Sequence, residues 1–408
     1  MTNILMIHHA KNFESNASYL SDDFFLANTH LFGAQEMDTW AGYRLLQQSH
    51  QTFRLQISQN LGRFQLLHGS QVLSDSALRD PKTSNLKNMF NYGKTLFQYL
   101  DTTIASNMNS SLKVFIEKLI HELDISLIWC DTQFYDALLP KKFPIVIRSV
   151  NFEPFHVMRE DPSQLRYIRR LGKLVSERRI ARTRTLVPIS PRDLHSYRIL
   201  AKGDYEVLPL RQLPFLMQSL EKSQVDSTNS EFEFPFVYFA GSNFDVKHNL
   251  DNLRRITEVI APRLYSRFPK LRILIFGHKF PSNIFYPSNV IKMYFRKDYH
   301  SIIQRSIAAL VPSPGGSGMQ SKVYEALCMG IPLIAHHEAL SRFPFYSNEH
   351  YLPGSTVTDF IESIEYLLSN REEALLMGKH SSLLCRQLFH FDLFRATMNE
   401  VIHRALVR

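Results

Sequence analysis

Short runs of apolar residues recur along the chain, and most of them are separated by segments with the apolar spacing of helices. The run 3–9 is continuous, whereas 52–58 alternates, with Phe53, Leu55 and Ile57 on one face. Further runs that predict strands are 125–130, 144–150, 186–189, 205–210, 236–240, 272–276, 307–311 and 333–335. Helical spacing marks 85–123, 249–268, 319–330, 359–368, 371–387 and 393–406. This alternation indicates an α/β protein with parallel sheets covered by helices on both faces.

A polar, serine-rich stretch at 218–233 interrupts the alternation and is typical of a linker. It predicts an N-terminal domain at 1–217 and a C-terminal domain at 234–385, each a doubly wound, Rossmann-like sheet. A helix at 386–408 is expected to pack back toward the N-terminal domain. Ligands of such sheets bind outside the carboxyl ends of the strands, so the two domains are expected to face a central cleft.

One loop combines several features of an anion or sugar site. The strand 307–311 leads into Gly315, Gly316 and Gly318, and a helical pattern begins near Met319. Glycines let the backbone approach a ligand, and the free N–H groups of a helix start point at it. Lys322 and Glu325 lie three apart, on one face of that helix. The alternative is a tight turn with an ordinary surface lysine.

A second segment, 241–249, follows the first strand of the C-terminal domain and supplies Gly241, Ser242 and Lys247. Lys247 and Lys322 would then serve one anion, since a diphosphate that leaves without a metal needs cations and dipoles to stabilise its charge. A solvated loop lysine at position 247 is equally compatible with the segment alone.

Composition narrows the possible partners and cofactors. The chain has 408 residues, a net charge of +9 and three widely spaced cysteines, Cys130, Cys328 and Cys385. That cysteine pattern favours a reducing compartment over a disulfide framework. No signal peptide or membrane span is expected, and no metal-ligand spacing occurs, so no metal or cofactor is predicted. The dinucleotide fingerprint fails at Ser321, and Gly93-Lys94-Thr95 lacks the glycine of a phosphate-binding loop at position 88.

Segments 241–249 and 315–332 resemble the second domain of family-4 retaining glycosyltransferases of the GT-B fold. Lys247 falls on the family's lysine, and Glu325 falls on the second of its two glutamates, which implies a contact with the ribose hydroxyls of the donor. Ser242 replaces the usual arginine, and Ser317 replaces the first glutamate. One branch reads Gly-x-Gly-Met-x-x-Lys-x-x-Glu-Ala here, as this chain does. Lys322 is therefore expected to replace the missing arginine as a phosphate cation.

The first domain resembles the same family more faintly. Asn151 and Glu153 match a His-Asn-x-Glu motif in which Val150 replaces the histidine. Glu177, Ser190 and Asp193 also follow the family's order. His8 and His9 end the first predicted strand and would face the acceptor, although a structural role for either histidine is the commoner outcome.

The segment 159–184 is basic and amphipathic. Nine arginines and lysines are interleaved with Leu165, Ile168, Leu171 and other apolar residues. Such a helix can lie on an anionic membrane surface, and a solvated basic face is the alternative. Nucleic acid is not expected as a partner, because no recognised binding module accompanies the charge.

The resemblance implies a cytoplasmic enzyme that transfers a sugar with retention and without a metal. A peripheral position at the inner face of the membrane stays open. Its donor would be a nucleotide-diphosphate sugar, and its acceptor a glycan, a lipid-linked sugar or a protein. Lys247, Lys322 and Glu325 are the expected catalytic residues. The donor site would comprise Gly241, Ser242, Gly315, Gly316, Ser317, Gly318, Met319, Lys322 and Glu325. Two alternatives stay open, a nucleotide-sugar epimerase of the same fold and a non-catalytic sugar-nucleotide or glycan-binding protein.

Overall fold

The computed structural model describes residues 2–10, 34–58, 62–69, 71–78, 109–161, 163–222, 232–294, 298–313, 315 and 317–408. The described chain divides into two compact units. The first contains β1, residues 35–211 and 392–408, and the second contains residues 212–391. The predicted site residue Gly316, the Gly93-Lys94-Thr95 segment and most of the predicted linker lie outside the described residues.

The first unit is built on a seven-stranded sheet of order β4-β3-β2-β1-β5-β6-β7. Its strands are β1 (Asn3–His9), β2 (Gln51–Ser58), β3 (Arg63–His68), β4 (Gln71–Ala77), β5 (Leu127–Cys130), β6 (Ile145–Ser149) and β7 (Thr185–Pro188). Its helices are α2 (Ala34–Gln47), α6 (Ser110–Glu122), the 3₁₀ helix η4 (Gln133–Leu138), α7 (Glu153–Glu160), α8 (Arg166–Thr183), α9 (Pro191–Leu200) and α17 (Phe391–Val407). The five strands from β2 through β1 to β7 are parallel, as predicted.

Two features of this sheet differ from the sequence predictions. Strands β3 and β4 form an antiparallel extension that the apolar pattern did not reveal, because β4 is largely exposed. The predicted strand at 205–210 is wrong. That segment runs beside the edge strand β7, and Leu208 N–H bonds the Pro188 carbonyl. Neither Pro188 nor Pro209 has an N–H to donate, so no strand ladder forms.

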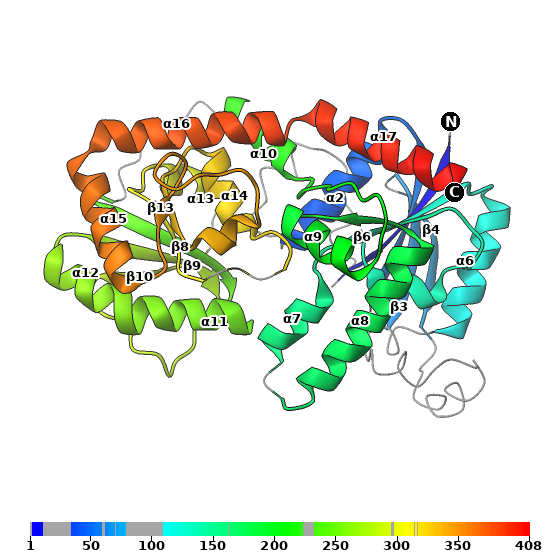
Figure 1. Cartoon of the computed structure of the whole chain (residues 1–408), viewed down its shortest axis with the longest axis horizontal. Coiled ribbons are helices and arrows are strands. Elements are labelled where there is room, and N and C mark those ends of the chain that lie inside the picture. Colours follow the sequence, from blue (N-terminus) through cyan, green and yellow to red (C-terminus); the bar gives the residue numbers. More distant parts are fainter. Residues whose placement is uncertain are drawn as a thin grey trace. The chain divides into compact units, whose positions relative to one another are not determined.

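The second unit carries a six-stranded parallel sheet of order β10-β9-β8-β11-β12-β13. Its strands are β8 (Phe236–Asn243), β9 (Arg272–His278), β10 (Val290–Met293), β11 (Ala309–Val311), β12 (Leu333–Ala335) and β13 (Leu352–Pro353). Its helices are α10 (Leu213–Lys222), α11 (Lys247–Arg254), η5 (Arg255–Ile260), α12 (Ala261–Arg267), α13 (Tyr299–Gln304), α14 (Ser321–Cys328), η6 (His337–Leu340), α15 (Val357–Ser369) and α16 (Arg371–Leu388). Figure 1 shows the strands lying between α11–α12 and α14–α16.

The predicted helix at 249–268 is one helical run with a π turn, η5, in its middle. Pro262 follows that turn and has no N–H for the carbonyl four residues earlier, which explains the irregular register. The glycine loop ends where α14 begins, two residues after the predicted start at Met319.

In each sheet the strand order reverses beside one central strand. The reversal lies between β1 and β5 in the first unit, and between β8 and β11 in the second. Ligands of doubly wound sheets bind at the carboxyl ends of the strands at this switch point. Segment 241–249 follows β8 and the glycine loop follows β11, so both sequence-predicted donor segments flank the switch point of the second sheet.

Candidate functional site

The backbone of the glycine loop depends on two residues in the left-handed region. Gly315 has φ +75° and Gly318 has φ +78°, a conformation that L-residues with side chains rarely adopt. A Cβ on Gly315 would lie 2.8 Å from the Glu338 carbonyl oxygen, and Ser341 Oγ donates to the Gly318 carbonyl at 2.7 Å. The segment around η6 therefore holds the loop in place.

Glu325 has one hydrogen-bond donor on each carboxylate oxygen. The Tyr299 hydroxyl donates to Oε2 at 2.9 Å, and His300 Nε2 lies 3.0 Å from Oε1. Both partners come from the first turn of α13. A carboxylate can accept about four hydrogen bonds, and the Glu325 side chain keeps 22% of its surface exposed. It can therefore accept further hydroxyl donors from a ligand.

Two buried tyrosines lie near this carboxylate. Burial, together with the negative charge of Glu325, raises the pKa of Tyr299 and the pKa of Tyr238 well above the ordinary value. Both hydroxyls consequently stay protonated at neutral pH. Among the described residues, the Tyr238 hydroxyl has no hydrogen-bond partner.

Lys322 reaches from α14 to the first turn of α11. Its Nζ donates to Asn249 Oδ1 at 3.0 Å and lies 4.7 Å from the ring centroid of Phe239 on β8. The ammonium group is thus held beside β8 and α11 by a cation–π contact and a hydrogen bond. Lys322 and Glu325 keep the common helix face that their spacing predicted.

The other donor-side residues have local structural partners. Lys247 begins α11 and forms an ion pair with Asp251 one turn later. Gly241 lies at a bulge between β8 and β9, where a Cβ would lie 2.3 Å from the Phe244 ring. Ser317 and Met319 are half-buried in the loop. The backbone of Ser242 belongs to β8. The donor roles of these residues stay predictions.

The histidines that end β1 differ from each other in environment. His8 is buried, and burial, with the charge of Arg54 next, lowers its pKa to about 3. Its Nδ1 lies 3.2 Å from the His9 carbonyl oxygen, and its Nε2 has no partner among the described residues. His9 Nδ1 lies 3.2 Å from the Tyr135 hydroxyl. His8 is therefore a neutral histidine near the switch point of the first sheet.

Asn151 and Glu153 follow β6 and are fixed by a buried polar group. The Asn151 carbonyl accepts from Ser149 Oγ at 2.7 Å and from Gln133 Nε2 at 3.1 Å. Glu153 forms an ion pair with Lys173 at 3.7 Å, which also lies over the Phe134 ring. The sequence could not reveal these partners, because they come from η4 and α8.

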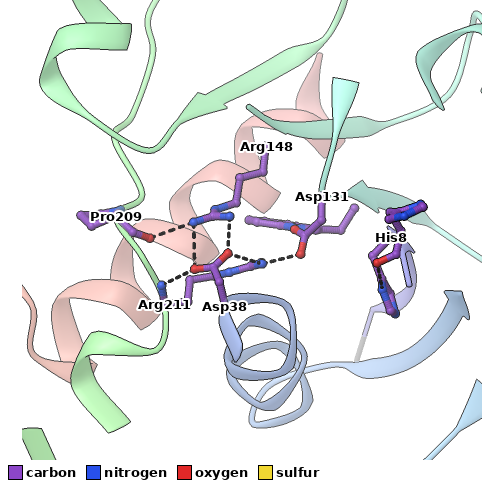
Figure 2. Close-up of polar contacts among 8 residues, drawn as sticks. His8, Asp38, Asp131, Arg148, Pro209 and Arg211 are labelled. Carbon is purple, nitrogen blue, oxygen red and sulfur yellow. Dashed lines mark hydrogen bonds and ion pairs between the residues drawn. The ribbon is translucent and has the colours of Figure 1, made fainter. Parts of the chain in front are cut away.

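The first unit also contains a buried network of two arginines and two aspartates (Figure 2). Asp38 on α2 accepts from Arg148 and Arg211, and Arg211 also donates to Asp131. Arg148 donates to the Pro209 carbonyl at 3.0 Å. A Cβ on Gly42 would lie 2.1 Å from the Arg211 guanidinium, so this glycine makes room for the network. The opposite charges pair with one another, and the hydrogen bonds to Pro209 and Arg211 tie residues 209–211 to α2 and β6.

The basic segment 159–184 comprises the end of α7, a short connection and α8, and several of its apolar side chains face solvent. Leu165, Ile168 and Leu171 are spaced three apart and are 55%, 49% and 45% exposed. Phe155 on α7 and Tyr167 are similarly exposed, and Arg166 stacks over the Tyr167 ring. No helix in the described ranges is long and apolar enough to span a bilayer.

Sequence reasoning missed Tyr299 and His300 as partners of Glu325, and the segment around η6 that supports the loop. A Tyr-His pair at the start of a short helix was the only available signal. Its proximity to Glu325 depends on how α13 and α14 pack on the sheet, which no local pattern encodes. The described residues contain no cluster of three potential metal ligands.

Comparison with protein families gives one match, which covers residues 254–391. The family is described as glycosyl transferase-like. The match includes the glycine loop and Glu325, but it does not reach Lys247. No curated protein is similar enough in sequence to match.

Solved structures resemble the chain over nearly its whole length. Sucrose-phosphate synthase from Thermosynechococcus elongatus has a TM-score of 0.61 at 13% identity, with 100% of both chains covered. A glycosyltransferase from Rickettsia africae has a TM-score of 0.59 at 10% identity, covering 99% of this chain and 98% of its own. HepE of Anabaena, solved with UDP-glucose, has a TM-score of 0.56 at 11% identity, covering 99% and 100%. The predicted GT-B fold with two parallel-sheet domains is thereby confirmed.

Proposed function

We propose that the chain is a retaining glycosyltransferase whose nucleotide-diphosphate sugar donor binds to the second unit. The proposal depends on one observation: hydrogen bonds fix the carboxylate of Glu325 at the switch point of the second sheet. Tyr299 and His300 orient it, and its unused acceptor positions suit the two hydroxyls of a ribose. The family match over 254–391 and the UDP-glucose bound to HepE support this choice of ligand.

The diphosphate would be bound by the glycine loop and Lys322. The loop exposes backbone near the start of α14, where N–H groups and the helix dipole favour an anion. Lys322 is already positioned by Asn249 and Phe239, so little reorganisation is needed when charge develops on the leaving group. Lys247 would add a second cation at the start of α11. For this its ammonium group has to exchange the ion pair with Asp251 for the diphosphate when the donor binds.

In the reaction implied by the resemblance, the bond between the anomeric carbon and the diphosphate oxygen breaks. A bond from the acceptor oxygen forms on the same face, and the acceptor proton passes to the departing diphosphate. The protein then acts mainly by positioning both partners and stabilising charge. No metal or cofactor takes part, and the acceptor would lie toward His9, Asn151 and Glu153.

Titration calorimetry with a panel of nucleoside diphosphates tests the donor site. We expect Glu325→Ala to weaken the preferred ligand about tenfold, because a charged hydrogen-bond group is lost, and Lys322→Ala to weaken it similarly. Glu362→Ala and Lys270→Ala change exposed residues of the same unit and should bind normally. Wild-type affinity in both site variants would contradict the assignment.

Product analysis by NMR tests the reaction. Transfer with retained anomeric configuration supports the proposal. Interconversion of free sugar nucleotides without an acceptor would instead identify an epimerase, and binding without turnover toward any acceptor would favour a non-catalytic role.

We further propose that the surface formed by α7 and α8 attaches the enzyme to an anionic membrane, where a lipid-linked acceptor would be available. Exposed apolar side chains beside arginines are the features that interfacial helices use.

A further inference from the structure

A cavity of about 580 Å³ opens on the first unit, in a region to which neither the sequence patterns nor the family match assign a role. Its walls come from the end of α8 and the start of β7, from the loop after α9, and from the last turns of α17. The carboxyl end of α17 is marked C in Figure 1. Cavities of this size are typical of small-molecule sites.

The cavity lies at the opposite edge of the sheet from the acceptor-side residues. It is lined by Thr185 and Leu186, which open β7, whereas His9 and Asn151 come at or after the carboxyl ends of their strands. Substrates of doubly wound sheets bind at the carboxyl edge. An occupant of this cavity would therefore be bound apart from the reacting groups.

Basic side chains dominate the lining. Five arginines and lysines, Arg182, Arg184, Lys202, Arg404 and Arg408, are accompanied by two acids, Asp204 and Glu400. Two of the cations are neutralised locally. Arg184 Nε donates to Asp136 Oδ1 at 2.8 Å, and Arg404 donates to Glu206 at 3.0 Å and to Glu400 at 3.3 Å.

The other three cations lack such neutralisation. Arg408 donates to the carbonyl oxygens of Arg184 and Arg182, each at 2.7 Å. Those bonds place the guanidinium at the carboxyl end of α8 but bring no carboxylate to it. For Arg182 and Lys202, the described part of the chain provides no side-chain hydrogen bond or ion pair, and both side chains are exposed.

Two of these cations, Arg182 and Arg408, come together at the cavity, because Arg408 donates to the Arg182 carbonyl and both residues line it. The buried Tyr205 lies beside them. Its hydroxyl donates to the Ala201 carbonyl at 3.2 Å. Burial raises the pKa of Tyr205, while the positive charges of Arg408 and Arg182 oppose the increase. Both guanidinium groups are thus close enough to act on one hydroxyl. The hydrogen bonds of Arg408 to the carbonyls at the end of α8 give this residue a structural role. They give no such role to the side chains of Arg182 and Lys202.

We propose that this cavity is a second anion site, which binds a free, small phosphate-bearing molecule through Arg182, Lys202 and Arg408. Guanidinium groups match phosphate oxygens in geometry, and two like charges held close together are stabilised when an anion lies between them. The bound anion would link the end of α8 to the last turns of α17 and act as an effector of the first unit.

Calorimetry with inorganic pyrophosphate at constant ionic strength tests this proposal on the full chain. The pocket variant is Arg182→Gln with Lys202→Gln. The matched control, Lys142→Gln with Arg198→Gln, removes the same charge from exposed positions elsewhere in the first unit. We expect the pocket variant to lose affinity by about tenfold or more, and the control to bind like the wild type. Equal losses in both variants would indicate general attraction to a basic protein and overturn the site.

Because pyrophosphate can also bind the donor loop, Lys322→Ala separates the two sites. In the Lys322→Ala variant, pyrophosphate should still bind to the cavity. A failure of the proposed donor site would therefore not contradict the cavity proposal. Amide hydrogen exchange locates the bound pyrophosphate. We expect pyrophosphate to slow the exchange of backbone amides in 181–186 and 400–408. Protection confined to the second unit would overturn the proposal. Melting curves of each variant, without ligand, establish that the variants are folded.

Discussion

The hydroxyl oxygen of Tyr197 lies 2.7 Å from Glu177 Oε2 and 2.7 Å from Ser149 Oγ. Ser149 Oγ in turn donates to the Asn151 carbonyl. The Tyr197 hydroxyl donates to Glu177 Oε2, and Gln133 Nε2 donates to Oε1 at 3.1 Å. The carboxyl group of Glu177 is therefore buried among neutral hydrogen-bond donors.

Glu177 therefore gives the protein a specific pH dependence. Burial, partly offset by the Tyr197 hydrogen bond, raises its pKa from 4.5 to about 8. Between these values the unfolded chain releases the proton while the folded chain keeps it. Stability must then fall as pH rises from 4.5 to 8, by at most about 1.4 kcal/mol per pH unit from this group.

Glu177→Gln should remove that contribution, because the amide imitates the neutral acid. We expect urea unfolding curves from pH 6 to 8 to be flatter in the variant than in the wild type. His8, whose pKa is about 3, acts in the opposite direction around and below pH 6.5, but it does so equally in both proteins and cancels in the comparison. The same slope in both proteins would show that Glu177 is already ionised in the folded state.

The orientation of Glu325 by α13 should matter for donor affinity more than for stability. Tyr299→Phe removes one hydrogen bond to the carboxylate, and we expect about tenfold weaker binding of the preferred nucleoside diphosphate. Tyr294→Phe, at an exposed tyrosine directly after β10, is the matched control.

A double-mutant cycle shows whether Tyr299 acts through Glu325. In the Glu325→Ala background, Tyr299→Phe should have almost no further effect on binding. Additive losses would mean that Tyr299 contacts the ligand independently.

The glycine loop should not tolerate a side chain at position 315. Gly315→Ala adds backbone strain at φ +75° and a contact of 2.8 Å with a carbonyl oxygen. We expect the free energy of unfolding to fall by about 2 kcal/mol and nucleoside diphosphate binding to weaken. Gly62→Ala separates the two causes, since Gly62 has φ +58° and no atom within 4 Å of the added Cβ. An equal loss of stability in the two variants would show that strain alone explains it.

Membrane attachment through α8 should depend on its exposed apolar residues. We expect Ile168→Ser with Leu171→Ser to reduce cosedimentation with phosphatidylglycerol vesicles by about tenfold. Ile199→Ser removes a residue that is 76% exposed on α9 and should leave binding unchanged. The wild type should bind neutral vesicles weakly, and equal binding to neutral and anionic vesicles would contradict the role of the arginines.

The sequence by itself determined the alternation of strands and helices and the position of the glycine loop. The apolar runs 3–9 and 333–335 form buried strands of parallel sheets, as predicted, and the glycines at 315 and 318 adopt a left-handed backbone. These features depend on neighbours in the chain, so local patterns are enough to predict them.

Only the tertiary structure decided which residues meet. The apolar segment 205–210 failed to become a strand because Pro188 on the edge strand and Pro209 in the segment have no N–H to extend the pairing begun by Leu208. Glu325 acquired its donors from α13, and the hydrogen bond from Tyr197 to Glu177 depends on how α8 and α9 pack together. Hydrogen bonds and ionisation respond to distances between side chains far apart in sequence, and packing alone sets those distances.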